Sequence, residues 1–181
     1  MMGCHESDAV TKEQVYDLLL DQTSLSFAPG AKWEYSDSNY FLLAMVVERV
    51  TGKTLGNYAR EAIFAPLGMA HSLFRESHSD VIPNRALSYV RHPVAFRSPS
   101  TYRQAARSPG AYHTLISNYE HVGAEGLYTT LENLAKWARN LTDNRLGQGG
   151  PALIERVLTP GQQRVSEEVG YGFGINVGTH I

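Results

Sequence analysis

The spacing of apolar residues between positions 40 and 52 is the feature that most constrains how this chain can fold. Apolar side chains recur there at helical intervals, at Tyr40, Leu43, Ala44, Val47 and Val50. Gly52 comes two residues after Val50, and glycine is a typical residue just after the end of a helix. The pattern predicts a helix over residues 38–50, with these five side chains on its apolar face.

Further helices are predicted on both sides of this one. Thr11 and Gln14 have the spacing of a capping box at the start of a helix over residues 11–22. Residues 55–63 predict another helix, which ends at Ala65-Pro66 because proline disfavours helix in the residue before it. An apolar stripe behind Thr130 predicts a helix over residues 130–141, with Thr130 as its N-cap, and residues 152–158 predict a short one.

The middle of the chain and its end follow other patterns. Residues 75–121 contain four prolines and no sustained periodicity, so we expect a long irregular segment with one short strand at residues 86–90. Residues 171–177 alternate large side chains with small or polar ones, which predicts a strand.

Composition excludes several classes of protein. The 181 residues, 43% of them hydrophobic, suffice for one globular domain. With 16 basic and 18 acidic side chains the net charge is -2, so nucleic acid is not an expected partner. No apolar run approaches the ~20 residues of a membrane span. The seven histidines are dispersed and there is one cysteine, so we expect no metal site, and the absence of nucleotide-binding glycine motifs predicts no cofactor.

Residues 27–44 carry the most specific signal. They contain Phe27-Ala28-Pro29-Gly30 and then Tyr35-Ser36-Asp37, and they resemble the second catalytic motif of the serine β-lactamase, penicillin-binding-protein and esterase superfamily, in which Phe-x-Pro-Gly precedes Tyr-Ser-Asn and a helix. Four later stretches are similar to that family in the same order: residues 48–54, 63–69, 123–130 and 171–174.

The resemblance implies an α+β fold, in which an antiparallel sheet flanked by helices joins a mostly helical domain with the active site between them. For residues 1–181 we expect part of this domain. The expected structure is mostly α: the helical domain, the long irregular middle segment and an incomplete antiparallel sheet.

The resemblance also implies site residues. In the family, the serine of Ser-x-x-Lys forms an acyl-enzyme, and the lysine and the motif tyrosine pass the proton. The match gives Tyr35 the proton-transfer role and places Asp37 at the substrate-binding asparagine position. A phenol can accept a proton near neutral pH only if cations lower its pKa from ~10. Two alternatives stay open: Asp37 as a turn or N-cap residue, and Tyr35 as a half-buried aromatic side chain.

Two motifs of the family are missing from this sequence. The residues three positions before the four lysines are Ala9, Pro29, Val50 and Asn133, so there is no Ser-x-x-Lys, and no His-x-Gly or Lys-Thr-Gly follows residue 174. We therefore expect an interior piece of a serine hydrolase, inactive alone, whose longer parent acts on a small amide or ester. The alternative is a non-catalytic helical binding module.

Two further expectations concern the environment of the chain. Its apolar residues include surface that would pack against the absent sheet, which predicts self-association of the chain made alone. No basic-then-apolar export signal begins at Met1, which predicts a cytoplasmic location for the chain as written. Export of a longer parent protein stays open, because many relatives are exported.

Overall fold

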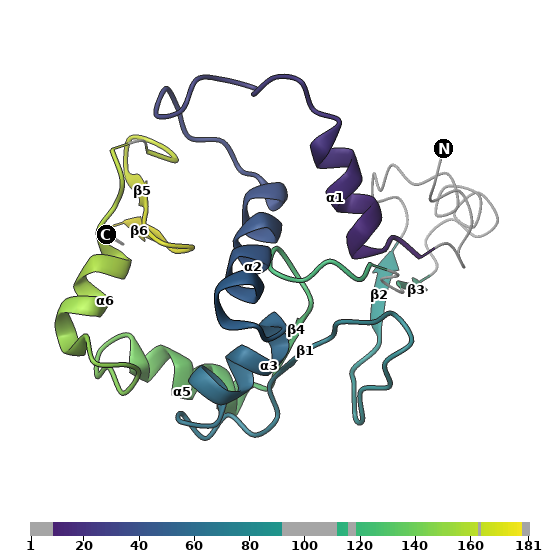
Figure 1. The fold of residues 1–181 in the computed structure, drawn as a ribbon. Coiled ribbons are helices and arrows are strands. Elements are labelled where there is room, and N and C mark those ends of the chain that lie inside the picture. Colours follow the sequence, from purple (N-terminus) through teal and green to yellow (C-terminus); the bar gives the residue numbers. More distant parts are fainter. Residues whose placement is uncertain (1–8, 92–111, 116–118, 163, 179–181) are drawn as a thin grey trace.

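Helices make up most of the regular structure in the computed structural model, which describes residues 9–91, 112–115, 119–162 and 164–178. The helical segments are α1 (Lys12–Leu20), α2 (Asp37–Thr51), α3 (Leu55–Ala59), η1 (Arg60–Phe64), α5 (Leu131–Asn140) and α6 (Gly150–Leu158). In Figure 1, α2 lies at the centre, with α1 on one side and the C-terminal segment on the other. Each of the five helices predicted from the sequence is confirmed, with small shifts at its ends.

Local capping explains where these helices begin and end. The Thr11 side chain accepts a hydrogen bond from the Gln14 backbone, and the Gln14 side chain accepts one from the Thr11 backbone, so the predicted capping box is present. Thr130 caps α5 in the same way through Asn133. Gly52 ends α2 with a φ of 67°, a left-handed conformation that glycine adopts without the steric cost of a side chain.

The strands form three separate two-stranded antiparallel sheets in the part of the chain that is described. The pairs are β1 (Leu73–Phe74) with β4 (Leu127–Tyr128), β2 (Ser88–Arg91) with β3 (Tyr112–Leu115), and β5 (Val169–Tyr171) with β6 (Asn176–Gly178). Their registers align Leu73 with Tyr128, Ser88 with Leu115, and Val169 with Gly178. The fold is α+β, with helices predominating and short antiparallel strands, as predicted.

Two expectations about strands need correction. The strand predicted at residues 86–90 exists as β2, but it pairs with β3, so part of the expected irregular segment is an antiparallel strand pair. Residues 92–111 of that segment lie outside the described residues. The single strand predicted over residues 171–177 is wrong: the chain turns there, with the Gly172 N–H donating to the Ile175 carbonyl at 2.8 Å. Gly174, with a φ of 79°, supplies the turn conformation.

The main core lies between α3, η1, β1 and α5. Ala59, Phe64 and Met69 are buried there, and the partly buried Phe74 and Trp137 pack against them. Phe64 enters this core from a π-helical turn, in which the Ala65 N–H donates to the Arg60 carbonyl. The predicted helix over residues 55–63 therefore continues into this wider turn.

The apolar face of α2 is buried differently from the sequence prediction. Phe41 and Ala44 are the buried residues of this helix. Leu43 and Val50, two of the five side chains expected on the packed face, are 55% and 79% exposed. The spacing predicted the helix correctly, but the described elements cover only one side of it.

Candidate active site

Tyr35 lies in the segment that leads into α2, and its side chain is 71% exposed. Its hydroxyl group donates a hydrogen bond to Oδ1 of Asp37 at 2.7 Å. The structure thus brings the two residues of the predicted site into direct contact. The open position of the ring argues against the alternative in which Tyr35 is a half-buried packing residue.

The start of α2 fixes the position of Asp37. Ser36 is the N-cap: its backbone is extended and its hydroxyl accepts a hydrogen bond from the Asn39 N–H. Asp37 is therefore the first residue of the helix rather than its cap, which corrects one alternative reading. A carboxylate in the first turn is favoured by the partial positive charge at a helix N-terminus. Because Ser36 does the capping, the Asp37 side chain can accept from Tyr35.

This contact determines the proton affinity of Tyr35. The hydrogen bond to Asp37 and the negative charge of that carboxylate raise the pKa of Tyr35, with smaller contributions from burial, Tyr171 and Glu125. A raised pKa keeps the phenol protonated at neutral pH. A tyrosine that accepts a proton near neutral pH needs a lowered pKa, whereas the pKa of Tyr35 is raised.

The lysines of this chain do not offset that effect. Lys32, the lysine nearest to Tyr35 in sequence, binds the Glu34 carboxylate at 2.7 Å. The other three contact different partners: Lys12 binds Glu48, Lys53 binds Glu61, and Lys136 donates to the Gly68 carbonyl. A cation that lowers the pKa of Tyr35 would have to come from outside the described residues.

Aromatic side chains join the segment before α2 to the β5–β6 hairpin. The rings of Trp33 and Tyr171 lie 5.7 Å apart between centroids, and the hydroxyls of Tyr40 and Tyr171 are 2.7 Å apart. Burial and this hydrogen bond raise the pKa of Tyr40 to about 12. A Cβ at Gly174 would lie 3.3 Å from the Tyr40 hydroxyl, so the turn of the hairpin closely approaches α2. The matched segments 27–44 and 171–174 therefore meet at this point.

Glu125, in the loop before β4, is a candidate site residue that was not predicted from the sequence. Gly123 packs so closely on α2 that a Cβ there would lie 2.5 Å from the Tyr40 carbonyl oxygen. The His121 ring meets the Phe41 ring edge-on, 6.2 Å away. Glu125 lies in the same loop, 3.5 Å from His121, and its charge makes a small contribution to raising the pKa of Tyr35. The only sequence feature that could have pointed to Glu125 is its position within residues 123–130, one of the stretches that resemble the family.

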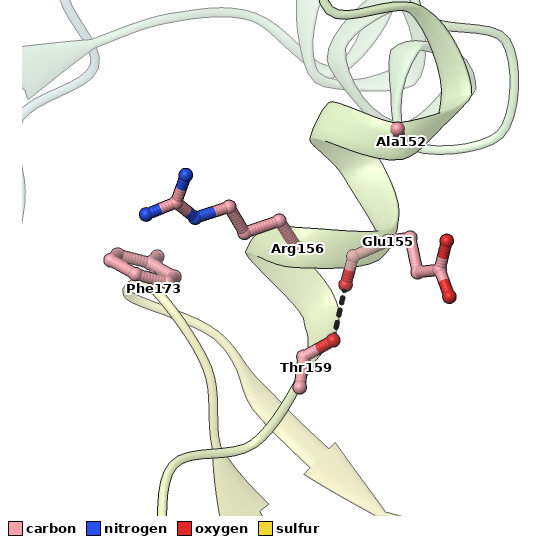
Figure 2. A pocket seen from close by; sticks show the side chains of 5 residues that line it. All are labelled: Ala152, Glu155, Arg156, Thr159 and Phe173. Atoms are coloured by element: carbon pink, nitrogen blue, oxygen red, sulfur yellow. Dashed lines mark hydrogen bonds between the residues drawn. The ribbon is translucent and has the colours of Figure 1, made fainter.

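A separate hollow of about 360 Å³ lies between α6 and the turn of the β5–β6 hairpin. Figure 2 shows its lining residues, which are Ala152, Glu155, Arg156, Thr159 and Phe173. Neither Tyr35 nor Asp37 lines it. Among the described residues, no group of three or more His, Cys, Asp or Glu side chains could hold a metal ion, and no helix is long and apolar enough to cross a membrane.

Comparison with known proteins identifies the family. The Beta-lactamase family profile matches residues 6–180, which is nearly all of the chain. The chain belongs to the beta-lactamase family. A relative, the D-aminopeptidase of Brucella ovis, is 25% identical over 163 residues, which cover 90% of this chain and 28% of that protein.

Solved structures of the family share this fold. The D-amino acid amidase of Ochrobactrum anthropi in complex with D-phenylalanine matches 99% of this chain and 51% of its own, with a TM-score of 0.72 and 21% identity. The octameric penicillin-binding protein homologue of Pyrococcus abyssi matches 92% of this chain and 35% of its own, with a TM-score of 0.70 and 24% identity. The chain thus spans about half or less of the length of each of these relatives.

Proposed function

We propose that this chain supplies part of the active site of a serine hydrolase that cleaves an amide or ester through an acyl-enzyme. Tyr35 is the proton-transfer residue in this proposal, and Asp37 lies against the substrate. The observation that carries it is the exposed Tyr35 hydroxyl, held by Asp37 at the start of α2 within the motif-like segment. A packing tyrosine would bury its ring, whereas a site tyrosine must present its hydroxyl to another molecule.

The substrate class that we propose is the amide or peptide of a D-amino acid. Two relatives are named for such activities, as a D-aminopeptidase and a D-amino acid amidase. The carboxylate of Asp37, in contact with the Tyr35 hydroxyl, is compatible with a substrate that carries a free amino group. Neutral β-lactams or simple esters would gain nothing from this charge.

We propose no turnover by the 181-residue chain alone, because it has no Ser-x-x-Lys motif. A serine hydroxyl becomes an effective nucleophile only beside a group that takes its proton, and none of the four lysines has a serine three residues before it. The purified chain should therefore neither react with a fluorophosphonate probe nor hydrolyse D-phenylalanine amide. Labelling or turnover would contradict this part of the proposal.

The gene provides the complementary test. The DNA on both sides of this reading frame should encode, in frame, a Ser-x-x-Lys upstream and a His-x-Gly or Lys-Thr-Gly downstream. The product of the extended frame should then be labelled by the fluorophosphonate at that serine. Stop codons on both sides, together with a stable expressed chain, would overturn the hydrolase proposal and favour the non-catalytic binding module.

We also propose that the chain made alone self-associates through the exposed face of α2. Leu43, Val46 and Val50 lie at helical spacing on this face and are more than half exposed. An apolar patch of this kind is typical of an interaction surface. The octameric assembly named for the Pyrococcus abyssi homologue shows that a relative can associate.

Sedimentation velocity tests this surface. The double variant Leu43→Ser/Val46→Ser should sediment more slowly than the original chain at equal concentration, because the apolar contact area is lost. The variant Val81→Ser is the matched control, since Val81 is also exposed but lies in the loop between β1 and β2. A monomeric original chain would refute the proposal, as would equal sedimentation of the original chain and the double variant.

A further inference from the structure

We propose that Asp37 is a positioning residue that aims the Tyr35 hydroxyl and keeps its proton in place. This inference rests on the proposed function, because it concerns how the site tyrosine is set for proton transfer. It goes further by giving the aspartate, which stands where the family motif has an asparagine, a role of its own. That role is to make Tyr35 a hydrogen-bond donor.

The geometry carries the argument. Asp37 is held in the first turn of α2 because Ser36, with an extended backbone, caps the helix, and Tyr35 directly precedes the cap. Their side chains meet with an oxygen-to-oxygen distance of 2.7 Å. An ionised carboxylate can only accept, so the hydroxyl proton of Tyr35 must point at Asp37. The lone pairs of the phenol oxygen then remain available for another molecule.

An asparagine at position 37 would not fix this orientation. Its amide can either accept from the phenol or donate to it, so the Tyr35 proton could point at position 37 or away from it. An asparagine also carries no charge, and the phenolate form of Tyr35 would not be repelled. The aspartate therefore restricts Tyr35 in two ways, through hydrogen-bond direction and through charge.

The neighbouring titratable groups also raise the pKa of Tyr35. Around Tyr35, Asp37 projects from α2, Glu125 from the loop before β4, and Tyr171 from β5, and each raises the pKa of Tyr35. On the segment of Tyr35 itself, Glu34 and Lys32 neutralise one another in an ion pair. Tyr35 should therefore lose its proton only at a higher pH than an ordinary phenol, unless a cation from elsewhere approaches the pair.

Titration of the tyrosine ring by NMR tests this inference directly. With tyrosine labelled with ¹³C at Cζ, the signal of Tyr35 is assigned as the one lost in Tyr35→Phe. The variant Asp37→Asn should lower the titration midpoint of Tyr35, because it removes the charge and keeps the side-chain shape. The matched control is the double variant Lys32→Gln/Glu34→Gln, which removes both members of a neighbouring ion pair, keeps the net charge constant and should leave the midpoint unchanged.

Three results would overturn the proposal: an unchanged midpoint in Asp37→Asn, an equal fall in Lys32→Gln/Glu34→Gln, or a fall in Asp37→Glu as large as in Asp37→Asn. Asp37→Glu keeps the carboxylate and should retain the raised midpoint. If Asp37→Asn does not fold, Asp37→Glu still tests the role of the carboxylate. It keeps the charge, so a fall of the Tyr35 midpoint in this variant would contradict the proposal. The titration requires no catalysis, so its failure is distinguishable from failure of the proposed hydrolase activity.

Discussion

The core around Phe64 and the site around Tyr35 are held together in different ways. The core packs apolar side chains from α3, η1 and β1, which are close in sequence, with α5. The site joins Tyr40 to Tyr171, which are 131 residues apart, through a hydroxyl pair and ring contacts near the surface. We infer from this difference that the stability of the fold resides mainly in the core, and we propose that the chemistry resides at Tyr35. Substitutions in the core should therefore reduce stability, whereas substitutions at Tyr35 should affect function.

The largest expected effect on stability is in the core. Phe64→Ala removes a ring that is buried and stacked on Phe74, 6.1 Å away between centroids. Loss of a buried phenylalanine costs about 3–5 kcal/mol of unfolding free energy, which urea unfolding would measure. Phe173→Ala, at a 68% exposed position, is the matched control and should cost less than about 0.5 kcal/mol. Similar losses of unfolding free energy in the two variants would contradict the conclusion that stability resides mainly in this core.

A smaller effect is expected where the core contains a polar network. The buried Asn133 donates to the Ser72 hydroxyl at 3.0 Å, and Ser72 contacts Thr129 at 2.7 Å. Asn133→Ala should cost about 1–3 kcal/mol, because it leaves buried polar groups without their partner. Urea unfolding of the exposed counterpart Asn57→Ala should show a clearly smaller loss. A loss in Asn57→Ala as large as that in Asn133→Ala would contradict the role of this network.

The contact between α2 and the C-terminal hairpin should contribute less. Tyr40→Phe removes the hydroxyl that contacts Tyr171 and keeps the ring, so we expect a loss of about 1 kcal/mol in urea unfolding at pH 7. Trp33 and Tyr171 would still hold the hairpin through their rings. Trp33 fluorescence should therefore change little, and a large change would show that the hydroxyl pair dominates the contact.

The same tyrosine predicts a dependence of stability on pH. The pKa of Tyr40 is about 12 in the folded chain, above its ordinary value of 10. The unfolded chain therefore loses this proton first as the pH rises. The stabilisation should be complete below about pH 10 and should be lost between about pH 10 and 12. Chemical unfolding across this range should show a shallower decline in Tyr40→Phe, and identical declines would contradict the assignment.

The smallest effect on stability is expected at Tyr35 itself. Its ring is exposed and its hydrogen bond to Asp37 is open to solvent, so Tyr35→Phe should change the unfolding free energy by no more than about 0.5 kcal/mol. Urea unfolding at pH 7 provides the measurement. A loss above about 2 kcal/mol would show that Tyr35 is a structural residue, and the separation of site and core would fail.

The sequence predicted well those features that depend on residues within a few positions of one another. The helix ends were accessible because Thr11, Gly52 and Thr130 act within one turn of their own position. The motif drew attention to Tyr35 and Asp37 as candidate site residues, whereas the hydrogen bond between them is seen only in the structure. The turn at residues 172–175 was missed, because glycines that alternate with larger residues fit both a strand and a turn until the pairing of β5 with β6 decides.

Other features depended on contacts that no local pattern contains. The exposure of Leu43 and Val50 follows from which elements reach α2, and helical spacing does not contain that information. The close packing of Gly123 against Tyr40 brings the loop that contains Glu125 onto α2, and no local pattern predicts it. Because the position of Glu125 depends on such long-range packing, it could not be predicted from the sequence.

The central claim, that Tyr35 serves the chemistry of a hydrolase and not the stability of the fold, is tested most directly by one rate. The rate is that of D-phenylalanine amide hydrolysis by the gene product that includes Ser-x-x-Lys, compared between Tyr35 and Tyr35→Phe. Loss of a proton-transfer residue predicts a fall of about 10²–10⁴-fold in kcat. An unchanged kcat in Tyr35→Phe would contradict the claim.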